Sequence, residues 1–283
     1  MSKLITAGFV RLFRLKSLYA CFAVIAFQLI VNIVGESGQL NMHVGVTVTT
    51  DDVSKSAQEI LAEMQFTADS HISEVSFLMI IAAAIVIGNL IGSEHGFGTM
   101  RNKLTIGHDR TEIYFANFIV SLTAVLMMLV FGWVLIFATA LPLGAKVVSP
   151  ADELVTLFLL NVLYALVISA LYVFIAMNVQ SKSNILTASI VLGGVMIIAN
   201  TLLDYQLSQP EYSYPPNSPP FPNPYYVSGT KRVVMEVADT LLPCSAVLEY
   251  DGEFEADKVT AEICETVIFT AAGLFMFRRT DLK

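Results

Sequence analysis

Ionisable side chains occupy two notable positions in an otherwise apolar sequence. Between Gly92 and Arg110 the chain reads GSEHGFGTMRNKLTIGHDR, a polar and mostly basic segment that separates two long apolar stretches. Further along, Glu262 and Glu265 lie three residues apart inside another apolar stretch. A basic segment of this kind can bind a partner or fix topology, and acids inside an apolar span can line a path for ions or substrates.

Several kinds of enzyme chemistry are disfavoured. An intramembrane metalloprotease needs His and Glu inside its spans to bind zinc and activate water, whereas the four His, at positions 43, 71, 95 and 108, all fall in predicted loops. The sequence has no GxxxxGK(S/T) segment, so no Walker-type loop can cradle ATP in this chain. We therefore expect no catalytic residue, metal ligand or cofactor here, and any use of ATP must come from another polypeptide.

The composition is that of a membrane protein. Of the 283 residues, 55% are hydrophobic and only 14% are charged, whereas soluble domains are about 25% charged. A helix needs about 20 mostly apolar residues to cross a bilayer with every backbone group paired. Six stretches qualify: Leu18 to Val34, Val75 to Ile91, Ile113 to Leu141, Leu154 to Met177, Ile185 to Leu203 and Val259 to Phe277. The predicted fold class is an all-α membrane protein, with one transmembrane domain over residues 1–283.

The distribution of charge predicts the orientation of these spans. If the N-terminus is cytoplasmic, the inner segments hold 11 of the 16 Lys and Arg and 4 of the 24 acids. The net charge of −8 then divides into about +7 inside and −15 outside, which satisfies the positive-inside rule. Both termini and residues 92–110 are expected in the cytoplasm, and the acidic balance argues against nucleic acid binding.

Three segments outside the spans carry further predictions. Residues 3–16 read as an amphipathic helix at the inner surface, with Lys3, Arg11 and Arg14 opposite its apolar side. This helix, an elbow over residues 1–16, either only anchors the first span or also contacts a partner. Extracellular loops are expected over 36–73 and 204–257.

The two outer loops are predicted to contain short elements. In the first loop, residues 51–64 could form a helix. In the second, residues 210–226 are too rich in Pro for a helix and predict an extended, polyproline-like wall. Residues 229–242 read as a helix that Pro243 ends. Cys244 and Cys264 lie on the outer side, where they could form a disulfide or remain two unpaired apolar residues.

The basic segment is predicted to contain a short amphipathic helix. Phe97, Met100 and Leu104 recur at i, i+3 and i+7 and so form one apolar stripe, while Arg101 and Lys103 point elsewhere.

The end of this helix is also marked in the sequence. Gly107 suits the left-handed residue that ends a helix, and Asp109 and Glu112 have the spacing of a capping box for the next span.

The same segment resembles a known family. Glu94, Gly98-Thr99, Arg101, Leu104, Gly107 and Arg110 resemble the E-x(3)-G-T-x-R-x-x-L...R pattern of permease subunits in the type-2 ATP-binding-cassette exporter family. The six spans, the N-terminal amphipathic helix and the long last outer loop are also similar. The Gly-Thr-x-Arg-Asn-Lys version of the motif and the Asn-Pro-Tyr-Tyr stretch at 223–226 resemble permeases of Firmicutes. Gly107-His108 and Asn117 depart from the Pro and the Lys that members often carry there.

This resemblance implies that the loop after the second span is a coupling helix that docks on a separate ATPase. The coupling residues would be Glu94, Phe97, Gly98, Thr99, Met100, Arg101, Lys103, Leu104, Gly107 and Arg110, with the stripe as the apolar contact and Arg101 and Lys103 at its rim. Two ATPase subunits and a second permease, identical or homologous, would complete an exporter for a peptide, drug or amphiphile. Such a subunit would lie in a bacterial plasma membrane among its lipids.

Other interpretations remain open from the residues alone. The basic segment could merely enforce topology, and the chain could be a non-transporting scaffold or sensor that binds a ligand with its outer loops. A secondary transporter is a weaker third interpretation, because spans two to five carry no Asp, Glu, Lys or Arg in their central portions. Four residues could line a substrate path: Asn32, Asn89, Glu262 and Glu265. The two acids could equally lie at the mouth of the last span, and the two Asn could equally bond neighbouring helices.

Overall fold

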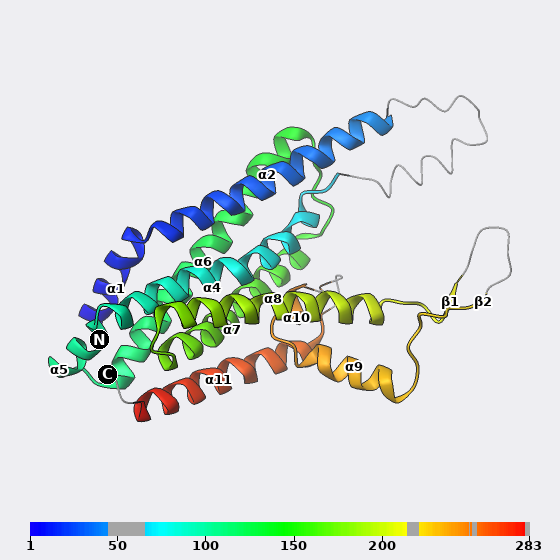
Figure 1. Cartoon of the computed structure of the whole chain (residues 1–283). Helices are drawn as coiled ribbons and strands as arrows, with labels where there is room; N and C mark the ends of the chain where they lie inside the picture. The colour runs from blue at the N-terminus through cyan, green and yellow to red at the C-terminus, as the bar shows by residue number, and fades with distance from the viewer. Residues whose placement is uncertain (45–65, 214–220, 249, 251–253, 281–283) are drawn as a thin grey trace, which may run out of the picture.

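The chain folds into long helices packed side by side, as the apolar stretches predict. A computed structural model describes residues 1–44, 66–213, 221–248, 250 and 254–280 (Figure 1). Six helices in it are long and apolar enough to cross a membrane. They are α2 (Lys16–Val44), α4 (Ile72–Gly96), α6 (Arg110–Ala140), α7 (Ala151–Asn178), α8 (Lys182–Leu207) and α11 (Ala256–Arg279). The predicted fold class and the six spans are confirmed.

Shorter elements join these helices. They are α1 (Ser2–Arg14), η1 (Asp69–His71), α5 (Thr99–Thr105), η2 (Leu141–Leu143), β1 (Tyr212–Ser213), β2 (Phe221–Pro222), α9 (Thr230–Thr240) and α10 (Ser245–Leu248). The predicted helices over 3–16 and 229–242 are confirmed as α1 and α9. The helix suggested for residues 51–64 lies outside the described residues. In the segment predicted to be polyproline-like, the described residues on either side of the gap instead form two short antiparallel strands, in which Ser213 pairs with Phe221.

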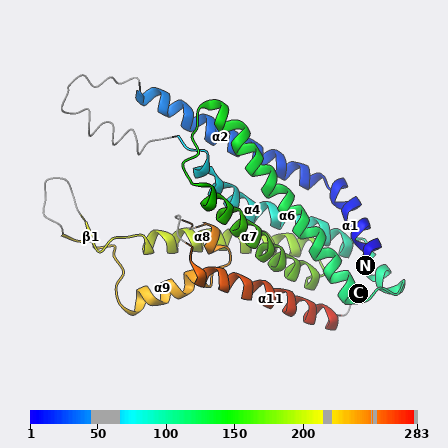
Figure 2. The same ribbon diagram turned by 180° about the vertical axis from the view of Figure 1, so that it is seen from behind.

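Helix α4 lies at the centre of the bundle and packs against α2, α6, α7 and α8, while α7 also packs against α11. Small residues allow these close approaches, as is common between membrane helices. A Cβ at Gly88 of α4 would lie 2.9 Å from Leu186 Cδ2 of α8, and a Cβ at Gly132 of α6 would lie 2.7 Å from Val75 Cγ1. Figure 2 shows the bundle from behind, with α6 beside α2 and α11 beside α7.

The two ends of the bundle differ in what they carry. At one end lie α1, α5 and the last turn of α11, which we call the termini end (Figure 1). At the opposite end lie α9, α10 and the β1–β2 pair. The termini therefore share one end, as an even number of spans requires.

Candidate functional site

The connection between α4 and α6 at the termini end is built around α5. Helix α4 ends at Gly96, α5 begins at Thr99, and α6 begins at Arg110. Gly98 (φ 67°) and Gly107 (φ 100°) are both left-handed, a conformation that glycine adopts without a Cβ clash, so each can reverse the chain at one end of α5. The predicted short helix and the left-handed Gly107 are confirmed.

Glu94, in the last turn of α4, is the centre of the site. Its side chain is fully buried. Lys103 Nζ of α5 donates to Glu94 Oε1 at 2.6 Å, and Asn117 Nδ2 of α6 donates to Oε2 at 3.2 Å. Arg11 of α1 forms an ion pair with the same Oε1. One carboxylate therefore joins four helices.

More positive than negative charges meet at this carboxylate. Two cations, Arg11 and Lys103, share the single negative charge of Glu94. Burial and then the charge of Arg11 lower the pKa of Lys103 to about 7, while the direct contact with the Glu94 carboxylate acts in the opposite direction. Because a buried charge that loses its partner is costly, this arrangement keeps α1 and α5 attached to α4.

Further hydrogen bonds hold the same turn in place. Thr99 Oγ1 donates to the carbonyl of Glu94 at 3.0 Å, which fixes the start of α5 on the end of α4. His95 Nε2 lies 3.1 Å from the carbonyl of Ala176, near the end of α7. The loop is therefore connected to α7 as well.

Arg110 connects the beginning of α6 to the end of α11. Its Nη1 donates to the carbonyls of Phe277 and Thr280, each at 2.6 Å, and its guanidinium lies 5.7 Å from the centre of the Phe277 ring. Arg278 Nη2 donates in return to Thr111 Oγ1 at 2.8 Å. These contacts cap the last carbonyls of α11, so the motif arginine holds the C-terminal helix.

The predicted apolar stripe needs correction. Met100 is 2% exposed, and Leu104 is half-buried against the same core, so both face the bundle. Phe97 lies before α5 and is 82% exposed, and Ile106, just after it, is 78% exposed. The outward apolar surface is therefore Phe97 and Ile106, because α5 begins only at Thr99, after the left-handed Gly98, and Phe97 does not share a helical face with Met100 and Leu104.

The predicted polar rim divides in the same way. Arg101 is exposed, whereas Lys103 is drawn inward by Glu94. The predicted capping box is not formed, although the predicted helix start is correct. Asp109 is the N-cap of α6 but makes no side-chain cap hydrogen bond. Glu112 lies instead near His108 Nδ1 at 3.3 Å and the N-terminal amine at 3.6 Å.

The four residues suggested for a substrate path do not converge. Asn32 Nδ2 of α2 donates to Glu74 Oε2 of α4 at 2.8 Å, and Asn89 Nδ2 donates to the carbonyl of Ile85 in its own helix. Glu262 is buried and accepts the amide of Ala246 at 3.2 Å, while Glu265 is half-buried on the same helix. In this structure Asn32 therefore bonds a neighbouring helix, Asn89 bonds its own helix, and of the four residues only the two acids lie together.

The cysteines of the described chain are free. Cys244 is buried and Cys264 is exposed, so the disulfide alternative is not formed. Burial, and then the charges of Glu262 and Glu265, raise the pKa of the Cys244 thiol, which keeps it an unreactive packing residue. Among the described residues, no group of three or more His, Cys, Asp or Glu is placed to hold a metal ion.

Sequence reasoning missed three members of the site. The amphipathic pattern places Arg11 opposite the apolar side of α1, Asn117 stands out only as a departure from a motif, and Ile106 carries no signal in the sequence. A buried acid such as Glu94 requires partners. The basic residues predicted at the same end of the bundle, Arg11 among them, could have been considered as those partners.

Neither the family comparison nor the comparison with curated proteins finds a match for this chain. The interpretation of the site therefore rests on its own geometry.

Proposed function

We propose that this chain is the transmembrane subunit of an ATP-driven exporter and that α5 docks on a separate ATPase. The observation that carries this proposal is the two-sided character of α5. Its inner side is attached to three other helices, α1, α4 and α6, through Glu94, while Phe97 and Ile106 present exposed side chains at its two ends. Exposed apolar side chains beside a polar surface are typical of protein contacts.

The connections of α5 fit a role in transmitting movement. A displacement of α5 would act on α1 through Arg11, on α6 through Asn117 and on α11 through Arg110. Packed helical interfaces switch between discrete arrangements, so a small movement at one end can change which side of a pathway is open. The subunit would contribute contacts that differ between two states, and the chemistry of ATP and Mg would belong to the ATPase.

The assembly we propose contains two ATPase subunits and a second permease, either a copy of this chain or a homologue. It would move a peptide, drug or amphiphile outward across a bacterial plasma membrane. The termini end carries the basic residues of α1 and α5 and would face the cytoplasm. The acidic opposite surface favours cationic substrates, although salt screens such attraction beyond about 8 Å.

Co-purification with the candidate ATPase tests this proposal. We would compare the wild type with Phe97→Asp plus Ile106→Asp, which changes only exposed side chains, and record bound ATPase and ATP hydrolysis. The matched control is Val148→Asp, because Val148 is 60% exposed and lies between η2 and α7. We expect the double variant to lose the ATPase and the control to retain it. If neither the wild type nor the control binds an ATPase, the exporter proposal fails and a non-transporting scaffold or sensor takes its place.

A further inference from the structure

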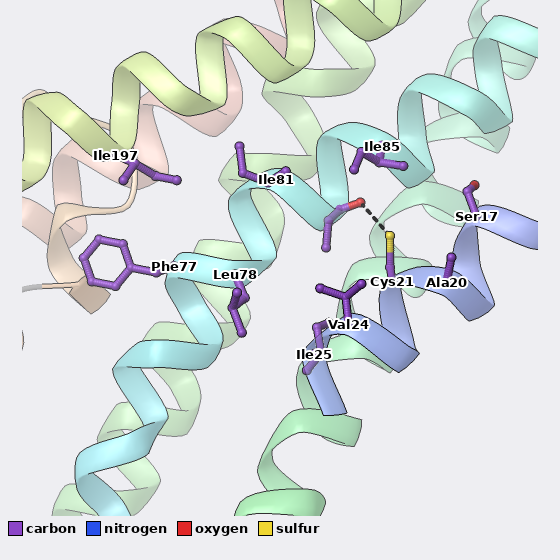
Figure 3. Close-up of a pocket in the computed structure, with 11 residues that line it drawn as sticks. Ser17, Ala20, Cys21, Val24, Ile25, Phe77, Leu78, Ile81, Ile85 and Ile197 are labelled. Carbon is purple, nitrogen blue, oxygen red and sulfur yellow. Dashed lines mark hydrogen bonds between the residues drawn. The ribbon is translucent and has the colours of Figure 1, made fainter. Parts of the chain in front are cut away.

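An apolar groove runs along α4 between α2 and α8 (Figure 3). Its floor is a face of α4, where Leu78, Ile81 and Ile85 recur at helical spacing. Ser17, Cys21 and Val24 of α2 line one side, and Ile197 of α8 lies on the other. The cavity volume is about 460 Å³, which is within the usual range for ligand sites.

The chemistry of the groove changes along its length. Apart from Ser17 and Cys21, every side chain that lines it is a hydrocarbon. Cys21 Sγ already has a partner, because it lies 3.9 Å from the carbonyl of Ala82. Ser17 Oγ is buried and has no hydrogen-bond partner in the described part of the chain. The groove is therefore apolar with one unpaired hydroxyl, and this hydroxyl lies toward the termini end.

Two lysines begin the helices that border the groove, at the same end of the bundle. Lys16 precedes Ser17 and is exposed, and exposed Lys182 begins α8. The Cγ of Lys182 lies 3.0 Å from where a Cβ at Gly92 of α4 would be, so this lysine packs on the helix that forms the floor. No acidic residue lines the groove. A ligand with a hydrocarbon chain and a negatively charged head group would suit both the apolar groove and the lysines near its end.

We propose that this groove binds an acyl chain of an anionic bilayer phospholipid, with the phosphate at the end marked by Ser17 and Lys16. The groove lies within helices long enough to span a membrane, so lipid has direct access to it. A hydroxyl donor and flanking lysines suit a phosphodiester. This site goes beyond the proposed exporter function and does not depend on it.

A second groove of the same bundle offers a contrast. It lies between α2 and α6, is lined by residues such as Phe22, Leu126 and Val130, and has a volume of about 530 Å³. Its polar residue, Thr123, already donates to the carbonyl of Ile119 at 2.8 Å. As in the first groove, no lysine or arginine is among its lining residues, so the unpaired hydroxyl of Ser17 and the lysine that begins α8 distinguish the first groove. We therefore expect it to exchange lipids freely, without selection for a head group.

Native mass spectrometry of the whole chain, released from nanodiscs of mixed phosphatidylglycerol and phosphatidylcholine, tests the proposal. We expect the wild type to retain one phosphatidylglycerol per chain. Ala20→Trp, which fills the groove from an exposed position, should reduce retention about tenfold, whereas Val130→Trp in the second groove should not. Lys16→Gln should reduce the preference for phosphatidylglycerol about fivefold, as expected for one lysine beside an anionic head group. Equal retention by the wild type and a folded Ala20→Trp variant would overturn the proposal.

Photocrosslinking of the wild type gives an independent result if Ala20→Trp does not fold. With a phosphatidylglycerol that carries a diazirine on its acyl chain, we expect adducts on peptides covering residues 17–25 and 77–85. Adducts confined to other segments, or a link between two copies of the chain through residues 17–25, would exclude a resident lipid.

Discussion

Two buried carboxylates at opposite ends of the bundle are paired very differently. Glu94, at the termini end, is fully buried and receives donors on both oxygens, from α1, α5 and α6. Glu262, toward the opposite end, is 1% exposed, and its Oε1 accepts one backbone amide, while its Oε2 has no hydrogen-bond partner among the described residues. The first carboxylate holds two cations from other helices, whereas the second accepts a backbone amide from α10 and has the charge of Lys258, on its own helix, nearby.

This difference shows where a shared buried charge holds separate helices together. A buried carboxylate that holds cations from other helices resists their separation, because each cation that leaves exposes an unpaired charge. A carboxylate with one amide partner resists much less. The termini end is therefore a fixed joint between helices, and the opposite end is attached more weakly at this point.

The largest effect is expected when the fixed joint is removed. Glu94→Ala should lower the free energy of unfolding by about 3–5 kcal/mol, because Arg11 and Lys103 lose their shared partner in a buried position. SDS-induced unfolding in mixed micelles measures this change. Glu112→Ala is the control, and it should cost about 0–1 kcal/mol because Glu112 is 39% exposed. Equal losses for the two variants would contradict the comparison.

A slightly smaller effect is expected for the inner side of α5. Met100→Ala should cost about 2–4 kcal/mol, since Met100 is 2% exposed and its removal leaves a cavity. Arg101→Ala, on the neighbouring exposed position, should change stability by no more than about 0.5 kcal/mol. The same unfolding assay measures both. If Arg101→Ala were more destabilising than Met100→Ala, the side of α5 that carries Arg101 would be the one that packs on the bundle, contrary to the structure.

The link between α6 and α11 should have an intermediate effect. Arg110→Ala removes two charge-assisted hydrogen bonds to the carbonyls of Phe277 and Thr280, and we expect a loss of about 1.5–3 kcal/mol. Hydrogen exchange of the last turn of α11 should become faster while exchange in α9 is unchanged. Unchanged protection of that turn would show that other contacts hold the C-terminal helix.

The smallest effect is expected at the opposite end. Glu262→Gln keeps an oxygen that can accept the amide of Ala246, so stability should change by about 1 kcal/mol or less. Glu94→Gln provides the comparison and should be clearly more damaging, since it removes the charge that two cations share. A Glu262→Gln variant less stable than Glu94→Gln would reverse the assignment of the fixed joint.

The sequence was sufficient for the fold and only partly sufficient for the site. Apolar length predicted all six spans, and glycine chemistry predicted the left-handed Gly107, because both depend on local properties of the chain. The partners of Glu94 could not be predicted, since Arg11 and Asn117 come from segments far apart in the sequence. Periodicity also placed Phe97 and Met100 on one face, but the helix begins only at Thr99, so the two side chains point differently.

We propose that the exposed ends of α5 contact an ATPase while its inner side is bound to the bundle. Site-specific photocrosslinking tests it most directly, with benzoylphenylalanine placed singly at positions 97, 106 and 148 in the assembled complex. We expect adducts with the ATPase from positions 97 and 106, and none from position 148 at the opposite end. Adducts from position 148 alone, or an absence of adducts at both 97 and 106, would contradict it.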